Sequence, residues 1–206
     1  MTVNTSAVIC FIIGKRGDFV KFQIKANTAE TMDDFMYFFD QRAFRDNPEW
    51  AGCYCLFPHK NQSEWESATA SENRMEAMVR LAENNLPGYL GYLNNEVIAW
   101  MAVGPRKQFK SIYEQHGNEE DLKRNIVSIT CVTIDPDYRN QGIATVMLER
   151  VLSDLKSQGI EIVEAYPLDT EGTNAHHHRG PLHLYQKAGF TIVDQKGVFT
   201  RVRKTL

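Results

Sequence analysis

Residues 125–159, NIVSITCVTIDPDYRNQGIATVMLERVLSDLKSQG, contain the pattern around which the rest of the chain is organised. Residues 126–134 are rich in Val, Ile and Thr, which favours a half-buried β-strand. Pro136 ends that strand, because proline has no N–H to donate to a neighbouring strand. The segment RNQGIA, at 139–144, follows and leads directly into a second element.

That second element is predicted to be an amphipathic helix. Apolar residues recur every four positions from 143 to 155, and Leu148 and Leu152 widen the stripe, so one helical face is buried. Gly159 stands where a left-handed residue commonly ends a helix. The stretch therefore indicates a strand, a glycine-containing loop and a helix in immediate succession.

The glycine at the helix entrance predicts an anion site. The first turn of a helix has N–H groups without intrahelical partners and a partial positive charge. Gly142 lets the backbone come close to a ligand, so the site favours phosphate or pyrophosphate. The segment lacks the Gly-Lys-Ser/Thr of a Walker loop and two of the three glycines of the dinucleotide fingerprint, so neither of those sites is indicated.

Two motifs resemble the GNAT superfamily of N-acetyltransferases. Residues 139–144 match its Arg/Gln-x-x-Gly-x-Gly/Ala signature, with Ala144 at the last small position. Residues 184–190, LYQKAGF, are similar to the family's Leu-Tyr-x-Lys-x-Gly-Phe. The resemblance covers about residues 20–206. It implies an α/β (α+β) GNAT fold, with a mixed, largely antiparallel sheet of six to seven strands that is flanked by helices and split near Ile134.

The resemblance also implies acetyl-CoA as co-substrate and assigns the residues that would bind it. Its pyrophosphate would lie on the loop, where Arg139 would either add charge or hold the loop in shape. Its pantetheine arm would lie along the central strand, where a backbone N–H would also donate to the oxyanion of the tetrahedral intermediate. The implied cofactor-binding residues are Val132, Thr133, Ile134, Arg139, Asn140, Gln141, Gly142, Ile143, Ala144 and Thr145.

The implied reaction is direct attack of an amine on the thioester. Tyr185 would be the catalytic acid that protonates the leaving thiolate; its alternative role is packing under the CoA arm. Cys131 offers an acyl-cysteine route, which we favour less because it belongs to a strand predicted to be buried. Where many relatives have Asn and Ala before this tyrosine, the chain has His178 and Pro181, so the acceptor site is expected to differ.

The base that deprotonates the amine is left open. An alkylammonium such as lysine has a pKa of about 10.4, so a base must take its proton. Many relatives have a carboxylate on the central strand, but residues 128–131 contain none. The candidates are His176, His177, His178, Asp169, Glu171 and the glutamates between residues 64 and 83.

The missing acid motivates a second interpretation, a CoA-binding regulatory or sensor protein without turnover. A third is a metal site that combines Cys53 and Cys55 with the histidine run. We predict no metal, because no second cysteine pair occurs elsewhere in the chain.

Other segments give local predictions. A helix is expected over residues 28–46, with Thr28 or Thr31 as its N-cap, and a polar helix over 61–85. A strand over 50–57 would point Cys53 and Cys55 in the same direction.

Two further predictions concern strands. Residues 89–93 and 97–103 indicate a hairpin. The basic residues Arg201, Arg203 and Lys204 would blunt an edge strand.

The chain length suits one domain with a substantial core. We divide it into residues 1–18, an N-terminal extension or extra strand, and residues 19–206, the acetyltransferase domain. The apolar runs at 7–13 and 19–25 would pair as a hairpin. We favour a loose extension instead, because chain ends are often poorly ordered.

Charge and cysteine content limit the partners. The formal net charge is −3 and the sequence pI is near 6.1, so we expect no nucleic-acid and no membrane partner. Four sparse cysteines, and an apolar run at 7–13 with no basic residue before it, favour a cytoplasmic protein. The expected partner is a small-molecule or peptide amine acceptor, and an exposed end strand would allow a homodimer.

Overall fold

The computed structural model describes residues 8–13, 19–116, 124–168 and 177–206. Its centre is a mixed sheet with the strand order β1-β2-β3-β4-β5-β6-β8-β7, in which β5 and β6 are parallel and the other neighbours are antiparallel. The strands are β1 (Val8–Ile13), β2 (Phe19–Ala26), β3 (Gly88–Leu93), β4 (Glu96–Pro105), β5 (Ile126–Ile134), β6 (Ile162–Ala165), β7 (Thr191–Lys196) and β8 (Phe199–Thr205). The mixed, largely antiparallel sheet predicted from the sequence is confirmed.

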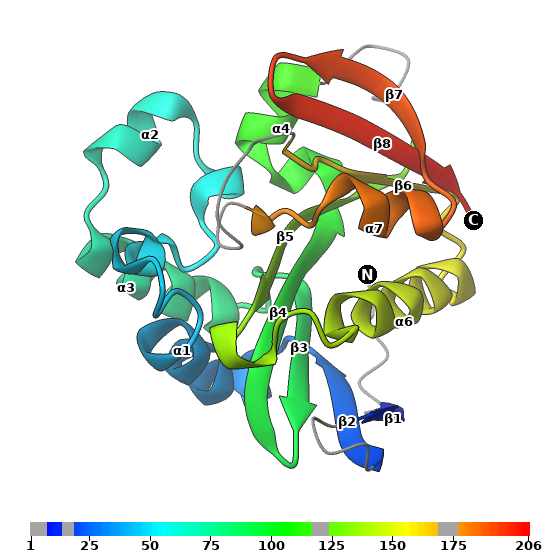
Figure 1. The fold of residues 1–206 in the computed structure, drawn as a ribbon. Helices are drawn as coiled ribbons and strands as arrows, with labels where there is room; N and C mark the ends of the chain where they lie inside the picture. The colour runs from blue at the N-terminus through cyan, green and yellow to red at the C-terminus, as the bar shows by residue number, and fades with distance from the viewer. Residues whose placement is uncertain (1–7, 14–18, 117–123, 169–176) are drawn as a thin grey trace.

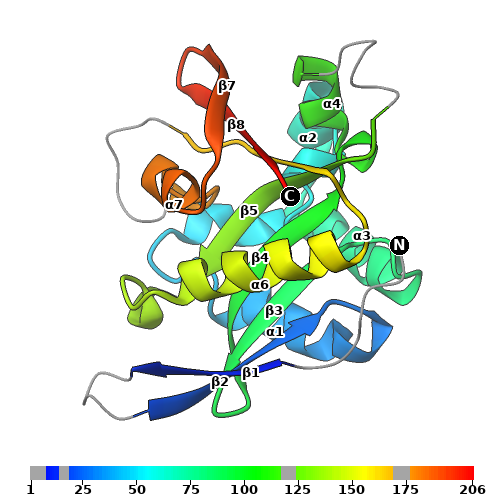
Figure 2. The ribbon, with the colours of Figure 1, turned by 90° about the vertical axis from the view of Figure 1, so that its right-hand side faces the viewer.

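Helices cover both faces of this sheet (Figures 1 and 2). One face carries α1 and α3, whose aromatic and aliphatic residues pack with Trp100 of β4 in one core. The other face carries α6, which lies across the strands in Figure 2 and forms a second core with Ile129 and Val132 of β5. The helices are α1 (Met32–Gln41), α2 (Gln62–Ser67), α3 (Ala70–Ala82), α4 (Lys110–His116), α6 (Ile143–Ser157) and α7 (Leu182–Lys187).

The strand–loop–helix unit has the boundaries that the sequence predicts. β5 ends at Ile134, a short 3₁₀ turn at Pro136–Tyr138 follows, and α6 begins at Ile143. Gly142 is the N-cap of α6 with φ +79°, and Gly159 follows the helix with φ +73°. Both glycines therefore occupy the left-handed region, where a side chain would be strained.

The sheet is split on one side of β5. Residues 126–129 of β5 pair in parallel with residues 162–165 of β6, and that pairing ends at Ile129. On its other side β5 remains paired with β4 as far as Ile134. The split therefore begins after Ile129 and extends to Ile134, which leaves one edge of the central strand without a strand partner in the described chain.

The N-terminal strands form the hairpin that the sequence left as an alternative. β1 pairs antiparallel with β2, from Val8 opposite Ile24 to Ile13 opposite Phe19. Residues from 19 onward supply seven strands, and β1 adds an eighth at the edge of the described sheet. The predicted hairpin of β3 and β4 is also present, with Asn94 and Asn95 at φ +50° and +71° in its turn.

The predicted strand over residues 50–57 is wrong. Pro48 starts a 3₁₀ helix that runs to Cys53, and Tyr54 and Cys55 follow with φ +43° and +56°. A proline at the first helical position and two left-handed residues are incompatible with an extended strand. Cys53 and Cys55 therefore do not have the side-by-side geometry of alternate strand residues.

Two other local predictions need adjustment. The helix expected over residues 28–46 is a 3₁₀ turn at Ala29–Thr31 followed by α1, which ends at Gln41. The polar segment 61–85 forms two helices, α2 and α3, because Asn61 and Thr69 each cap a helix through a capping box.

The basic residues near the C-terminus do not blunt an edge. β8 lies between β6 and β7, so it is an interior strand. The guanidinium groups of Arg201 and Arg203 face Glu164 of β6, and the Lys204 ammonium donates to the Ala188 carbonyl at 2.7 Å. No helix among the described residues is long and apolar enough to cross a membrane.

Candidate active site

The loop before α6 has the backbone shape of an anion site. Asn140 and Gly142, on either side of Gln141, both have positive φ, at +60° and +79°. Left-handed residues at alternate positions turn successive backbone N–H groups toward one concave surface. α6 has fifteen residues and no acidic residue in its first turn. A Cβ added to Gly142 would meet no described heavy atom within 4 Å, so the space beside this glycine is open.

Ion pairs hold this loop against residues 42–46, the turn that follows α1. The Arg139 guanidinium donates to the Ile134 carbonyl at 3.0 Å and to both carboxylate oxygens of Asp46. This hydrogen bond with Arg139 lowers the pKa of Asp46. Arg139 therefore ties the loop to the end of β5 and to the segment after α1.

Asp135 provides a second anchor at the end of β5. Its carboxylate is fully buried and accepts hydrogen bonds from the guanidinium groups of Arg42, at 2.9 Å, and Arg45. The backbone N–H of Asp137 donates to the same carboxylate at 3.1 Å. The loop is therefore fixed at its base while its glycine end stays open.

The edge of β5 in the split has a backbone contact at the predicted pantetheine position. The Val132 N–H points into the split and donates to the His178 carbonyl at 2.6 Å. Thr133 is buried, and its hydroxyl lies 3.1 Å from the Cys131 sulfur. Of the three strand residues predicted to bind the arm, Val132 thus has its N–H on the edge of β5 that faces the split.

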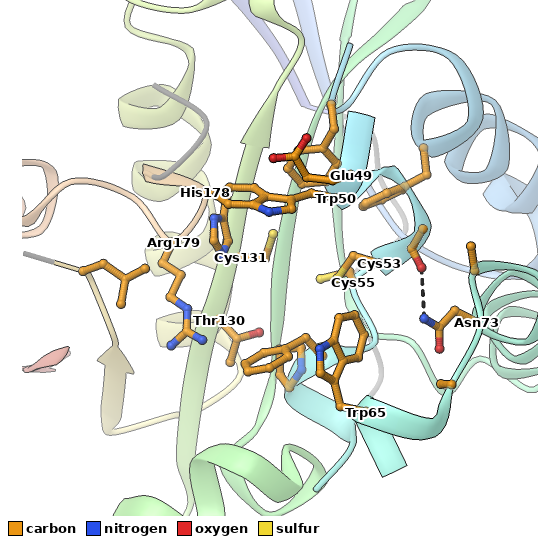
Figure 3. Close-up of a pocket in the computed structure, with 18 residues that line it drawn as sticks. Glu49, Trp50, Cys53, Cys55, Trp65, Asn73, Thr130, Cys131, His178 and Arg179 are labelled. Carbon is orange, nitrogen blue, oxygen red and sulfur yellow. Dashed lines mark hydrogen bonds between the residues drawn. The ribbon is translucent and has the colours of Figure 1, made fainter. Parts of the chain in front are cut away.

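A cavity of about 400 Å³ opens beside this split, on the face of the sheet that carries α1 and α3 (Figure 3). Its walls come from the 3₁₀ segment at 48–53, from α2, α3 and β5, and from the segment before α7 (Figure 3). The lining is mainly aromatic and apolar. The lining residues are Phe39, Phe44, Glu49, Trp50, Gly52, Cys53, Cys55, Phe57, Pro58, Trp65, Ala68, Ala70, Asn73, Thr130, Cys131, Leu168, His178 and Arg179.

A bulge in β5 brings two consecutive residues to this cavity. Ala102 of β4 is opposite Cys131 and Val103 is opposite Ile129, so Thr130 is an extra residue in β5. Neighbouring strand residues normally point to opposite faces, but Thr130 and Cys131 both line the cavity.

Three cysteines meet at the cavity as free thiols. Burial raises the pKa of the Cys53 thiol to about 11. Burial also raises the pKa of Cys55 well above its usual value. The hydrogen bond from Cys55 lowers the pKa of Cys131, helped by the Thr133 hydroxyl, although burial opposes this shift. Among the described residues, no group of three or more His, Cys, Asp or Glu is placed to hold a metal ion.

Tyr185 lies behind the cavity wall. It is fully buried, and its hydroxyl donates to the Arg179 carbonyl at 2.6 Å. Burial raises the pKa of this phenol above its ordinary value. Gly180 makes the contact possible, because a Cβ there would lie 2.8 Å from the Tyr185 hydroxyl.

The residues predicted as candidate bases lie in different parts of the structure. His178 lines the cavity, with its ring 5.1 Å from the ring of Trp50. Glu64, Glu72 and Glu76 line a different, polar cavity together with Lys60 and Lys110. The candidates His176, Asp169 and Glu171 lie outside the described residues.

Sequence reasoning missed four groups at the cavity. No sequence motif marked these residues, which are Glu49 at the rim, Thr130, Arg179 and Trp65. Only the position of Arg179 had an indirect signal, because it follows His178, which replaces the Asn of many relatives.

Several solved structures with a similar fold are described as acetyltransferases. PaiA N-acetyltransferase from Thermoplasma acidophilum, solved with coenzyme A, is 14% identical with a TM-score of 0.55, and the alignment covers 90% of this chain and 99% of that one. The GNAT domain of S. lividans PAT is 13% identical with a TM-score of 0.57, with 96% and 97% covered. Ribosomal-protein-alanine N-acetyltransferase from Brucella melitensis is 15% identical with a TM-score of 0.53, with 89% and 99% covered.

The sequence itself also matches a known family. The Acetyltransferase (GNAT) family matches residues 24–190, which is most of the chain. The chain therefore belongs to the GNAT family and is a GNAT-type N-acetyltransferase. No curated protein matches it.

Proposed function

We propose that the protein transfers the acetyl group of acetyl-CoA to an amine by direct attack. The observation that carries this proposal is the juxtaposition of three features: the open, glycine-entered N-terminus of α6, the split beside β5, and the cavity at the end of that split. A phosphate site, a groove for an extended arm and an acceptor cavity are what the reaction requires.

Acetyl-CoA would bind with its pyrophosphate on the loop of residues 139–145 and its arm along Val132, Thr133 and Ile134. The Val132 N–H would give up its hydrogen bond to the His178 carbonyl and donate instead to the thioester oxygen. In the tetrahedral intermediate the same N–H would stabilise the oxyanion. The amine nitrogen would form the new C–N bond to the acetyl carbon as the C–S bond breaks.

Once the amine is neutral, two protons move in this reaction: the nitrogen loses one and the departing thiolate gains one. His178, the histidine that lines the cavity, is the group we assign to accept the amine proton. Tyr185 is the group we assign to protonate the departing thiolate, and its hydroxyl would leave the Arg179 carbonyl to do so. The three free thiols are consistent with the reducing cytoplasm expected from the sequence.

Calorimetric titration with acetyl-CoA tests the cofactor site. We expect the wild type to bind and Gly142→Glu to weaken binding about 100-fold or more, because a carboxylate would stand where the pyrophosphate binds. Gly159→Glu is the matched control: it also replaces a left-handed glycine with open space around it, at the other end of α6. Equal binding by wild type and Gly142→Glu would overturn the phosphate-loop assignment.

An amine panel with thiol release as readout tests turnover. Acetylation of any amine, verified by the mass of the product, supports the proposed reaction. Tight acetyl-CoA binding without acetylation of any amine would favour the alternative, a CoA-binding regulatory or sensor protein. That alternative is motivated by the absence of a carboxylate in residues 128–131.

A further inference from the structure

Two buried polar atoms at the cavity have no hydrogen-bond partner among the described residues. They are the Oγ1 of Thr130 and the Oδ1 of Asn73. Both residues are 3% exposed, and they line the cavity at opposite ends, with Trp65 between them (Figure 3). Because a buried polar atom without a partner is unfavourable, a ligand that hydrogen-bonds to both atoms gains affinity at each end.

The unused atom of Asn73 is a hydrogen-bond acceptor. Its Nδ2 donates to the Gly52 carbonyl at 3.0 Å, which fixes the plane of the amide and leaves Oδ1 without a described partner. The 3₁₀ segment and α3 are in close contact here, because a Cβ on Gly52 would lie 2.5 Å from the Cβ of Ala70. The fold therefore fixes Oδ1 in a position that complements a hydroxyl or an N–H, and not an ether or carbonyl oxygen.

Thr130 lies at the end of the cavity where the reaction would take place. It belongs to β5, two residues before Val132, whose N–H is the group assigned to the oxyanion, and two residues span about 6–7 Å along a strand. A hydroxyl oxygen accepts hydrogen bonds, so Thr130 can hold the N–H of the substrate amine beside the thioester. Asn73, on α3, would then meet the part of the substrate that is farthest from its nitrogen.

The dimensions and walls of the cavity favour a small molecule with a flat body. Its volume of about 400 Å³ is near the lower end of the range for small-molecule sites, about 300–1,000 Å³. Its walls include the rings of Trp50, Phe57 and Trp65, and such rings pack well against another ring. Aromatic faces also attract an ammonium group before it loses its proton.

We propose that the substrate is a small primary amine with an aromatic body and a hydrogen-bond donor at the end away from its nitrogen. Thr130 binds the nitrogen, and Asn73 accepts a hydrogen bond from the distal donor. This rests on the proposed function, because it takes the cavity as the site of the substrate amine. A phenolic hydroxyl suits the distal position, because a phenol pKa of about 10 keeps it a neutral donor at pH 7.

Matched amines test the distal donor. 4-Hydroxyphenethylamine, 4-methoxyphenethylamine and phenethylamine share one ring and one primary amine, but only the first can donate to Asn73. 2-Hydroxyphenethylamine has the same hydroxyl at the end of the ring nearest the nitrogen. We expect kcat/KM for the 4-hydroxy amine to exceed that of each of the other three by about 10-fold or more, because only it satisfies the buried amide oxygen. Equal or better use of any of the other three would overturn the proposal.

Two variants separate the two ends of the cavity. Asn73→Leu removes the distal acceptor, so the ratio of kcat/KM between 4-hydroxyphenethylamine and phenethylamine should fall to about 1. Thr130→Val removes the hydroxyl that meets the nitrogen, so kcat/KM should fall about 10-fold for both amines and their ratio should persist. An unchanged ratio in Asn73→Leu would overturn the assignment of Asn73, and a lost ratio in Thr130→Val would overturn the orientation of the substrate.

Asn27→Leu is the matched control for Asn73→Leu. Asn27 is also a buried asparagine, but its Nδ2 donates to the Leu86 carbonyl at 2.8 Å and its Oδ1 accepts from the Thr31 hydroxyl at 3.0 Å. Its loss should lower stability and leave the ratio between the two amines as it is. A ratio that falls equally in both variants would mean that lost stability, and not a ligand contact, causes the effect, and would overturn the assignment of Asn73.

A binding measurement tests the distal contact without turnover. Calorimetry in the presence of CoA compares 4-hydroxyphenethylamine with phenethylamine as probes. We expect the Kd of the hydroxylated amine to be about 10-fold lower, and we expect Asn73→Leu to abolish that difference. Equal Kd values in the wild type would overturn the distal contact.

The two proposals can fail separately. Acetylation of amines with no preference for a distal donor would overturn the distal contact and leave the proposed function intact. Binding that depends on Asn73, without turnover of any amine, would overturn the proposed function and support the distal contact. If Asn73→Leu does not fold, the four amines with the wild-type protein decide the question, because they differ only in the donor and its position.

Discussion

Cys131 is the residue that separates direct attack from an acyl-enzyme route. It lines the cavity beside the Val132 N–H, and contacts with Cys55 and Thr133 lower the pKa of its thiol. A lowered pKa is the usual property of a nucleophilic cysteine. The geometry alone would therefore allow a thioester to form on Cys131, and a kinetic test is needed.

We predict that Cys131→Ser retains kcat within about 10-fold of the wild type, because direct attack needs no thiol nucleophile. An obligatory acyl-cysteine would lose about 1,000-fold or more when its sulfur is replaced. Intact-mass spectrometry after incubation with acetyl-CoA alone should find no acetylated protein. An acetyl adduct that disappears on addition of amine would contradict direct attack.

A second test removes one atom, the hydroxyl oxygen of Tyr185, and asks whether Tyr185 is the proton donor. We predict that Tyr185→Phe lowers kcat by about 100-fold with little change in the KM for acetyl-CoA, because a general acid acts in the transition state. Burial raises the pKa of this phenol, and a donor is protonated below its pKa. Deprotonation of Tyr185 should therefore cause no fall in the wild-type rate up to about pH 10, the reference pKa of tyrosine.

Tyr92→Phe is the matched control for that variant. The Tyr92 hydroxyl is also buried and donates to the Asp34 carboxylate at 2.8 Å, but we assign it no role in the reaction. It should change stability and leave kcat as it is. An unaltered kcat in Tyr185→Phe would reduce Tyr185 to a packing residue that holds the Arg179 carbonyl.

At the scale of elements, the 3₁₀ turn Phe57–His59 couples stability to pH. His59 is 3% exposed, its ring centre lies 4.8 Å from that of Phe109, and its Nδ1 is 3.2 Å from the Gln108 carbonyl. Burial, with a smaller contribution from Arg80, lowers the pKa of His59 to about 4. The folded protein therefore keeps this histidine neutral in a range where an unfolded chain protonates it.

We predict that stability falls as the pH is lowered from about 6.5 to about 4, because the unfolded chain binds a proton that folded His59 does not. The loss attributable to this residue is about 3 kcal/mol. His59→Asn keeps a donor for the Gln108 carbonyl and cannot titrate, so its urea midpoint should depend less on pH. His183→Asn, at an exposed position on α7, should leave the slope unchanged, and an equal slope in His59→Asn would contradict the assignment.

Elements with local signals could be predicted from the sequence. β5 and α6 are confirmed because β-branched residues, Pro136 and a four-residue apolar period act within a few positions of each other. The segment 50–57 was predicted wrongly because its aromatic and cysteine content is typical of strands. Its backbone is set instead by Pro48 and by left-handed Tyr54 and Cys55, which composition does not indicate.

The candidate site was predictable only in part for the same reason. The phosphate loop is contiguous in sequence and carries a motif. The cavity is assembled from separate elements, so that Trp50, Thr130 and Arg179 become neighbours only after folding. A bulge adds one residue to a strand without any change of pattern, so the placement of Thr130 could not be derived from periodicity.

At the scale of the whole molecule, the two halves of the split sheet are joined by a buried charge cluster. Glu164 of β6 is fully buried. It accepts hydrogen bonds from Arg106 after β4 at 3.0 Å, from Arg203 of β8 at 2.6 Å and from the Tyr166 hydroxyl at 2.9 Å. The Tyr166 hydroxyl in turn lies 3.0 Å from the Ser128 hydroxyl of β5. One carboxylate thus connects strands on both sides of the split.

We predict that Glu164→Gln lowers the free energy of unfolding by about 3–5 kcal/mol, because it leaves buried guanidinium groups without their shared carboxylate. Urea denaturation at pH 7 measures the change, and Glu161→Gln, at an exposed position three residues earlier, should change it by less than about 0.5 kcal/mol. Since the cluster lies beside the point where the pairing of β5 and β6 ends, the variant should also weaken acetyl-CoA binding in calorimetry. A loss below about 1 kcal/mol would mean that backbone pairing alone holds the two halves, because a broken buried pair costs several times that amount.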